Sequence, residues 1–201
     1  ATAAELADGA FWMVPFAEGR APSAWYDADD ATLSRYMLAL EVLWARCVRE
    51  GFISGSAVGA ARERLAALCV RPEMIADRLV RECGPDRKIT LVGLGQNARH
   101  VAAVLSERGE RFDARDDRFG SATSTQVVGG KDIKVIGLGQ PFDNSASYIV
   151  TPNNDELIMA SLPAGLDCVR WSEASRDLSG EVLARMQAAV DIGRDRLGAA
   201  A

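Results

Sequence analysis

The residues of this chain that most clearly suggest a function are two glycines, at a defined spacing, that follow a short apolar segment. Gly93, Gly95 and Ala98 form a Gly-x-Gly-x-x-Ala pattern. In a strand–turn–helix segment the first glycine permits a tight turn, the second lets the backbone approach a pyrophosphate, and the third small residue lets helix and strand pack closely. Free N–H groups at the start of the helix attract an anion. We therefore expect Gly93, Gly95, Gln96, Asn97 and Ala98 to bind a phosphate-bearing ligand.

An acidic residue roughly 20 positions after these glycines extends the pattern. Asp116 ends the next predicted strand, where such a carboxylate accepts hydrogen bonds from the ribose of a dinucleotide. Asp113 is a second candidate for this role, and Arg115 or Arg118 could instead meet a 2′-phosphate. These residues predict NAD or NADP as the cofactor, and the sequence leaves both open.

Over about one βαβ unit, residues 89–116 resemble the dinucleotide-binding Rossmann fingerprint. The resemblance implies a mostly parallel sheet with helices on both faces. The chain is also similar to the amino-terminal domain of the Mur ligase family, through Val-Gly-Leu-Gly at 92–95, Arg-Gly at 108–109 and Asp-Asp-Arg at 116–118. Ligase activity is not implied, because the Gly-Lys-Thr/Ser phosphate loop is absent from the sequence.

A further resemblance is to the sugar-phosphate-binding fold of the SIS type. It is carried by small hydroxyl residues in a polar segment, and it implies that they hold a phosphate: Ser121, Thr123, Ser124 and Thr125. The whole segment 120–130 is predicted to be a loop that is mobile or wrapped over a site, since long loops of small polar residues are often functional.

The tetrapeptide Gly-Leu-Gly-Gln occurs twice, each time at the end of a predicted strand, at residues 93–96 and 137–140. Pro141 follows the second copy directly and disfavours a helix there, so only the first copy predicts a phosphate-binding turn. The alternative interpretation is that Gly93 and Gly95 only end a core strand of an α/β domain that binds no ligand.

The candidate for acid–base chemistry is His100, the one histidine of the chain. Its ordinary pKa near 6.5 suits proton transfer, but a lone histidine on a helix is more often solvated or at the edge of a core. The acidic cluster of Asp113, Asp116 and Asp117 could bind Mg²⁺ and is more typical of a charged turn. With four separate cysteines and no Cys-x-x-Cys pair, we expect no metal site.

The composition is that of a soluble globular protein, with 48% hydrophobic and 25% charged residues and a net charge of -5. This mild acidity argues against general binding to nucleic acid or to an anionic membrane. No apolar run is long enough for a membrane span. The few, separate cysteines fit a reducing compartment, so we expect a cytoplasmic protein. A chain that begins at Ala1 is expected to be a processed product or a fragment.

The elements that must position the site follow from hydrophobic periodicity. Residues 1–85 are expected to form an aromatic arm, over about residues 1–30, and a three-helix subdomain. Residues 86–201 are expected to form a Rossmann-like α/β domain. The predicted helices cover about residues 33–51, 56–70, 72–83 and 97–108, with two more starting near 154 and after 179. The predicted strands cover 89–93, 111–115, 132–137, 147–151 and 167–171.

A function of another class stays open. The amino-terminal aromatics and helices could form the contact surface of a non-catalytic structural or protein-interaction module, with a different protein or a second copy of the chain as partner.

Overall fold

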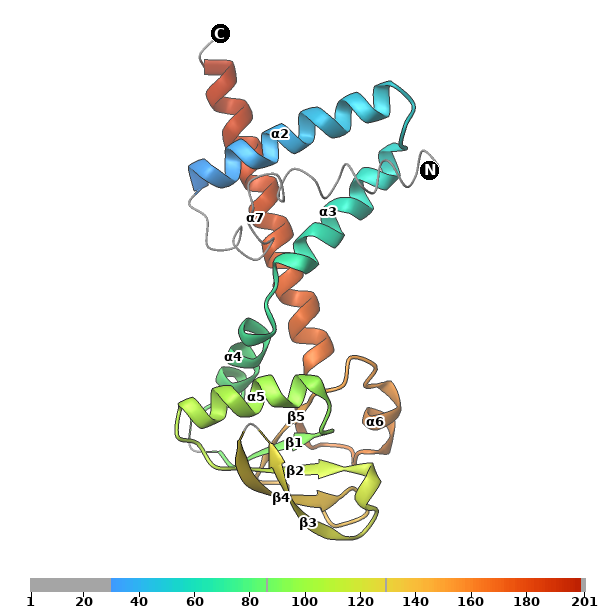
Figure 1. Cartoon of the computed structure of the whole chain (residues 1–201), viewed down its shortest axis with the longest axis vertical. Helices are drawn as coiled ribbons and strands as arrows, with labels where there is room; N and C mark the ends of the chain where they lie inside the picture. Colours follow the sequence, from blue (N-terminus) through green and yellow to red (C-terminus); the bar gives the residue numbers. More distant parts are fainter. Residues whose placement is uncertain (1–29, 86, 129, 200–201) are drawn as a thin grey trace. The chain divides into compact units, whose positions relative to one another are not determined.

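The structure is a computed structural model that describes residues 30–85, 87–128 and 130–199 (Figure 1). The aromatic arm expected before Asp30 lies outside the described residues. The described helices are α2 (Asp30–Arg49), α3 (Gly55–Cys69), α4 (Pro72–Glu82), α5 (Gln96–Glu107), α6 (Glu156–Ser161) and α7 (Trp171–Ala199), with a 3-10 turn η2 (Asp117–Phe119). The strands are β1 (Ile89–Val92), β2 (Phe112–Asp116), β3 (Thr123–Val128), β4 (Lys131–Gly137), β5 (Ser147–Val150) and β6 (Asp167–Arg170).

The chain divides into two compact units. In the described residues, the helical unit comprises 30–71 and 177–199, and the sheet unit comprises 72–176. This division differs from the segments 1–85 and 86–201 expected from the sequence. The physical reason is packing: α4 lies against α5 in the sheet unit, whereas the later part of α7 packs with α2 and α3.

The helical unit buries the apolar stripes that the periodicity of its helices predicts. Ser54 caps α3 by accepting a hydrogen bond from the N–H of Ala57. At the surface, the guanidinium of Arg62 donates two hydrogen bonds to one oxygen of Glu41 and a third to the other. The core residues of the unit are Leu33, Met37, Leu40, Trp44, Val58, Leu65, Ala66, Cys69, Val182, Met186, Ala189 and Val190.

The sheet has six strands in the order β3-β4-β2-β1-β5-β6. All neighbouring pairs are parallel except β3 with β4, which is antiparallel. The register aligns Ile89 of β1 with Phe112 of β2 and with Ser147 of β5. The expectation of an α/β protein with a mostly parallel sheet is therefore confirmed, and the predicted positions of five strands agree with the structure to within a residue or two.

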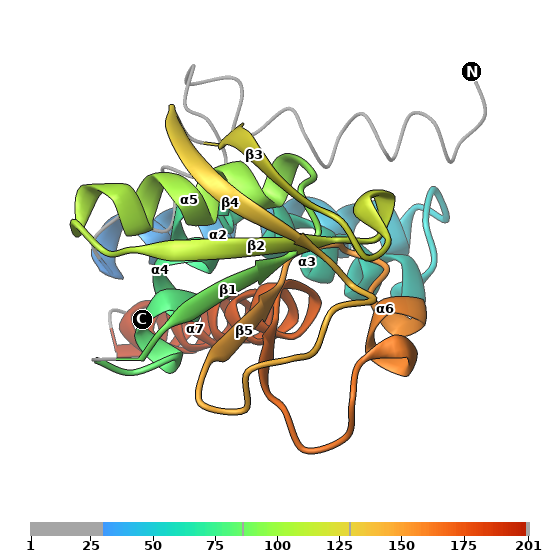
Figure 2. The same ribbon diagram turned by 90° about the horizontal axis from the view of Figure 1, so that it is seen from below.

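The two faces of the sheet are covered differently. Helices α4 and α5 lie side by side on one face (Figure 1, Figure 2). Because side chains alternate along a strand, Val92, Tyr148 and Val150 project from the other face. There they form a second core with residues from α6 and from the irregular connection between β4 and β5, including Phe142 and Ile158.

Two predictions about local structure are wrong. The segment expected as a mobile loop, residues 120–130, contains the strand β3, because its threonines and valines pair with β4 over six residues. The last helix begins at Trp171 rather than after Ser179, directly where β6 ends. As predicted, no helix follows the second Gly-Leu-Gly-Gln.

None of the helices among the described residues combines the length and the apolar character that crossing a bilayer requires. All four cysteines are free. Burial raises the pKa of the Cys69 thiol to about 12, and burial, with nearby carboxylates, does the same for Cys83. Both therefore behave as small apolar core residues, as the sequence predicts.

Candidate functional site

The first glycine turn lies at the carboxyl end of β1, in the middle of the sheet. In the sheet, β2, β4 and β3 lie on one side of β1, and β5 and β6 lie on the other side. The strand order therefore reverses beside β1, and ligands of open α/β sheets bind outside the carboxyl ends of the strands at such a point. The turn leads directly into α5.

On the β5 side, the turn is locked by packing and by hydrogen bonds. Gly93 has φ +85°, and a Cβ there would lie 3.0 Å from Cγ of Pro152. The hydroxyl of Thr151 donates to the carbonyl of Gly93 at 2.9 Å. The Asn97 amide donates to the carbonyl of Thr151 at 2.8 Å and to the side-chain oxygen of Asn153 at 3.1 Å. Asn97 thus ties the start of α5 to the end of β5.

On the β2 side, the carboxylate of Asp116 holds the turn. Its Oδ2 accepts the N–H of Leu94 at 3.0 Å. Its Oδ1 accepts Nε of Arg118 at 2.6 Å, and Nη2 of Arg118 reaches Oδ2 at 3.0 Å. Burial alone would raise the pKa of Asp116, but these hydrogen bonds and the charge of Arg118 together lower the pKa below its usual value. Asp116 is therefore a charged structural clamp on the glycine turn.

Between these two anchored sides, the start of α5 is open. Gly95 is the N-cap residue, with φ -77°, and no side chain caps the helix. A Cβ built on Gly95 would meet nothing within 4 Å. Gln96 is exposed, whereas Ala98 is fully buried and lets the helix approach the sheet. The first N–H groups of α5 and the positive end of its dipole thus meet open space, an arrangement suited to an anion.

The structure brings the predicted binding residues together, from Gly93 to Ala98 with Asp116 beside them. The hydrogen bonds of Asp116, however, differ from those expected of a carboxylate that binds a ribose. Both of its oxygens already accept two hydrogen bonds each. A ribose hydroxyl could replace only the contacts from the side chain of Arg118, which is 66% exposed.

Arg115, the other arginine considered for a 2′-phosphate, has a different role. It is 4% exposed. Its guanidinium donates to the carbonyls of Gln140, at 2.9 Å, and Pro141, and it stacks on the ring of Phe142 with 4.0 Å between the guanidinium carbon and the ring centroid. This explains an arginine within a buried strand: it satisfies carbonyl groups beyond the end of β4.

His100 lies away from the glycine turn, further along α5. Its Nδ1 is 3.3 Å from a carboxylate oxygen of Glu73 in α4, and its ring centroid is 6.3 Å from that of Trp171. Both contacts join α5 to neighbouring helices and not to the glycine turn. The geometry therefore does not support His100 as an acid or base for a ligand at the turn.

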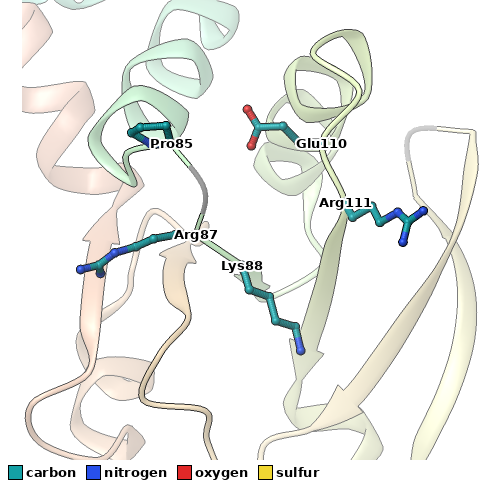
Figure 3. A pocket seen from close by; sticks show the side chains of 5 residues that line it. All are labelled: Pro85, Arg87, Lys88, Glu110 and Arg111. Carbon is teal, nitrogen blue, oxygen red and sulfur yellow. The ribbon is translucent and has the colours of Figure 1, made fainter.

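Two depressions among the described residues lie at the amino ends of the strands, opposite the glycine turn. One, with a volume of about 530 Å³, is lined by Pro85, Arg87, Lys88, Glu110 and Arg111. Figure 3 shows the side chains of Arg87, Lys88 and Arg111 pointing in different directions. Arg87 pairs with Asp167, and Lys88 lies 3.0 Å from Asp113. Because these cations do not converge, this edge is the weaker candidate for an anion.

No group of three or more His, Cys, Asp or Glu side chains among the described residues is arranged to hold a metal ion. Asp113 and Asp116 are three positions apart on β2, so they project from opposite faces of the sheet. The acidic cluster seen in the sequence therefore does not converge.

Sequence reasoning missed the contribution of β5. Thr151, Pro152 and Asn153 form one wall of the site. They stand more than 50 positions from the glycines, and the only available signal was that their strand also ends at the carboxyl edge of the sheet.

Comparison of the chain with protein-family models, with curated proteins and with solved structures yields no match.

Proposed function

We propose that this protein is a Rossmann-like binding domain that takes a nucleotide, a dinucleotide or another phosphate-bearing small molecule at the start of α5. The observation that carries the proposal is the uncapped N-terminus of α5, where Gly95 borders open space. The turn around it is fixed from both sides by Asp116, Thr151 and Asn97. An anion would thus meet donors that are already oriented, which lowers the entropic cost of binding.

The neighbourhood of Asp116 supports a preference among dinucleotides. Arg118 is exposed and paired with Asp116. NADP could place its 2′-phosphate against Arg118 without breaking the contact between Asp116 and Leu94. NAD would have to displace the side chain of Arg118 to reach the same carboxylate. We therefore expect NADP to bind more tightly than NAD. The proposal concerns binding and assigns no catalytic step.

The test is calorimetric titration of the full chain with NADP, NAD, ATP and inorganic pyrophosphate. We compare the wild type with Gly95→Asp and Gly95→Asn. Both side chains are tolerated at an N-cap, and Gly95 has an ordinary negative φ with free space around it, so both variants should fold. Only the aspartate places a negative charge where the phosphate would lie. We expect Gly95→Asp to weaken binding at least tenfold and Gly95→Asn to weaken it less.

Arg118→Gln should reduce the affinity for NADP and leave that for NAD equal or higher. Saturable binding by none of the four ligands would overturn the proposal. If Gly95→Asp and Gly95→Asn weaken binding equally, the added volume and not the added charge is the cause. In that case the N-terminus of α5 does not attract an anion.

A further inference from the structure

The strand β3 forms one end of the sheet and is paired on one side only. In the part of the chain that the structure describes, Thr123–Val128 pairs with β4 and with no other strand. Such an edge carries unpaired N–H and C=O groups, which can accept a further strand. Figure 2 shows β3 and β4 as a hairpin at the end of the sheet away from β5.

The hydrogen bonds of this hairpin identify the residues with free backbone groups. The N–H of Gly137 donates to the carbonyl of Ala122 at 2.8 Å, one step before Thr123 pairs with Ile136. Hydrogen-bonded and non-hydrogen-bonded pairs alternate along an antiparallel ladder. The even-numbered residues of β3 therefore bond to β4. The odd-numbered ones direct their N–H and C=O groups to the free edge: Thr123, Thr125 and Val127.

The side chains of β3 do not protect this edge. The strand has no charged residue and no proline, and Val127 is 71% exposed. The opposite end of the sheet, β6, has Asp167 and Arg170 at its two ends and lies against α4. Charges and covering elements are the usual means of preventing edge-to-edge pairing. Charged residues occur in β6 and are missing from β3, while each of the two strands also contacts a helix, α4 for β6 and α5 for β3.

We infer that β3 pairs with β3 of a second copy of this chain. An antiparallel pair about a two-fold axis normal to the sheet places Thr125 opposite Thr125 of the second copy. The same register places Thr123 opposite Val127 of the second copy. Every outward backbone group of the three odd-numbered residues is then bonded, and β-branched side chains meet on one face. A strand of six residues makes a small interface, so the dimer should depend on concentration.

The primary test is light scattering of the full chain across a concentration series. The wild type should pass from the monomer mass to twice that mass. Val127→Lys should remain monomeric, because it places two cations against the shared edge. Val42→Lys is the matched control, since Val42 is 70% exposed on α2 and outside the edge; it should dimerise like the wild type. Both variants should keep the circular dichroism spectrum of the parent.

The register has its own test. Thr125→Cys places two thiols on the two-fold axis, with Cα atoms about 5.5 Å apart, which is within the range of a disulfide. Mild oxidation should give a covalent dimer whose linking peptide contains residue 125 twice, and Val42→Cys should give none. A wild type that stays monomeric at every concentration, or a dimer that Val127→Lys leaves intact, would overturn the inference. Neither outcome bears on ligand binding at α5.

Discussion

The two copies of Gly-Leu-Gly-Gln end parallel strands of the same sheet, yet their surroundings differ. The first, residues 93–96, follows β1 and continues into α5, with Gly95 beside open space. The second, residues 137–140, lies under the turn formed by Gly120 and Ser121. A Cβ on Gly137 would be 1.9 Å from the carbonyl oxygen of Gly120, and one on Gly139 would be 2.8 Å from the hydroxyl of Ser121.

The comparison shows that the tetrapeptide specifies a turn after a strand and not a ligand site. In the second copy the glycines provide room for another part of the chain. The backbone there is satisfied by protein groups: Gly139 N–H donates to the Gly120 carbonyl at 2.9 Å, and Arg115 donates to the Gln140 carbonyl. In the first copy only Gly93 is required by conformation and packing. Gly95 has no such requirement: it serves as the N-cap of α5 and borders open space.

The largest expected effect is that of Gly137→Ala. The added methyl group would meet backbone atoms of Gly120, which cannot rotate away as a side chain can. We expect the free energy of unfolding to fall by about 3 kcal/mol. Urea denaturation followed by circular dichroism measures it. A loss as small as that of Gly95→Ala would contradict the close approach of the two segments.

Gly93→Ala should have the next largest effect. The residue has φ +85°, which L-amino acids with a Cβ rarely adopt, and its Cβ would press on Pro152 at 3.0 Å. We expect a loss of about 2 kcal/mol in the same denaturation experiment. An unchanged unfolding midpoint would mean that the turn adopts another conformation in solution.

Asp116→Asn tests the clamp that holds the first copy. The variant loses a charged acceptor shared by Leu94 and Arg118, so we expect a loss of about 1.5 kcal/mol at pH 7. The pKa of Asp116 is lowered in the folded state, so its contribution is complete above the unfolded pKa of about 3.9 and is lost as pH falls through the folded pKa. The difference between wild type and variant should therefore shrink below about pH 4.

Denaturant titrations at a series of pH values measure this difference. Arg118→Gln serves as a second variant, because it removes the charged partner and keeps the carboxylate. Its effect on stability should likewise decrease at low pH. A difference for Asp116→Asn that grows on acidification would contradict the lowered pKa.

The smallest expected effect is that of Gly95→Ala. Its Cβ would meet no atom within 4 Å, and φ -77° suits alanine. Alanine is a poorer N-cap than glycine, so a loss of less than about 1 kcal/mol should remain. The series Gly137, Gly93, Gly95 thus makes the same substitution at three glycines of two identical motifs, and a reversed order would refute the comparison.

Local patterns predicted much of the fold. Apolar periodicity located α2, α3 and α4, and short apolar runs between turn residues located five strands. The pattern failed at Thr123–Val128, where four consecutive polar residues suggest a loop and only the pairing with β4 reveals a strand. It also failed at the start of α7, where polar residues after Trp171 hide a helix stabilised by contacts such as that of Ser172 with Asp155.

The candidate site was predicted only in part, because some of its contacts join segments that are far apart in the sequence. Gly93 to Ala98 are contiguous, so their turn follows from local chemistry. The position of Asp116 follows from the length of one βαβ unit, but its pairing with Arg118 does not. The buried role of Arg115 depends on the carbonyls of the second glycine turn, which no local pattern reveals.

The sequence by itself determined the order of the helices and of five of the strands and the position of the sharp turns, because these depend on side chains within a few residues of one another. Only the tertiary structure decided that β5 adjoins β1, that Gly120 fills the space over Gly137, and that β3 pairs with β4 alone among the described strands. Each of these is a contact between segments separated along the chain. Their strength depends on shape and hydrogen bonding that appear only when the sheet is assembled.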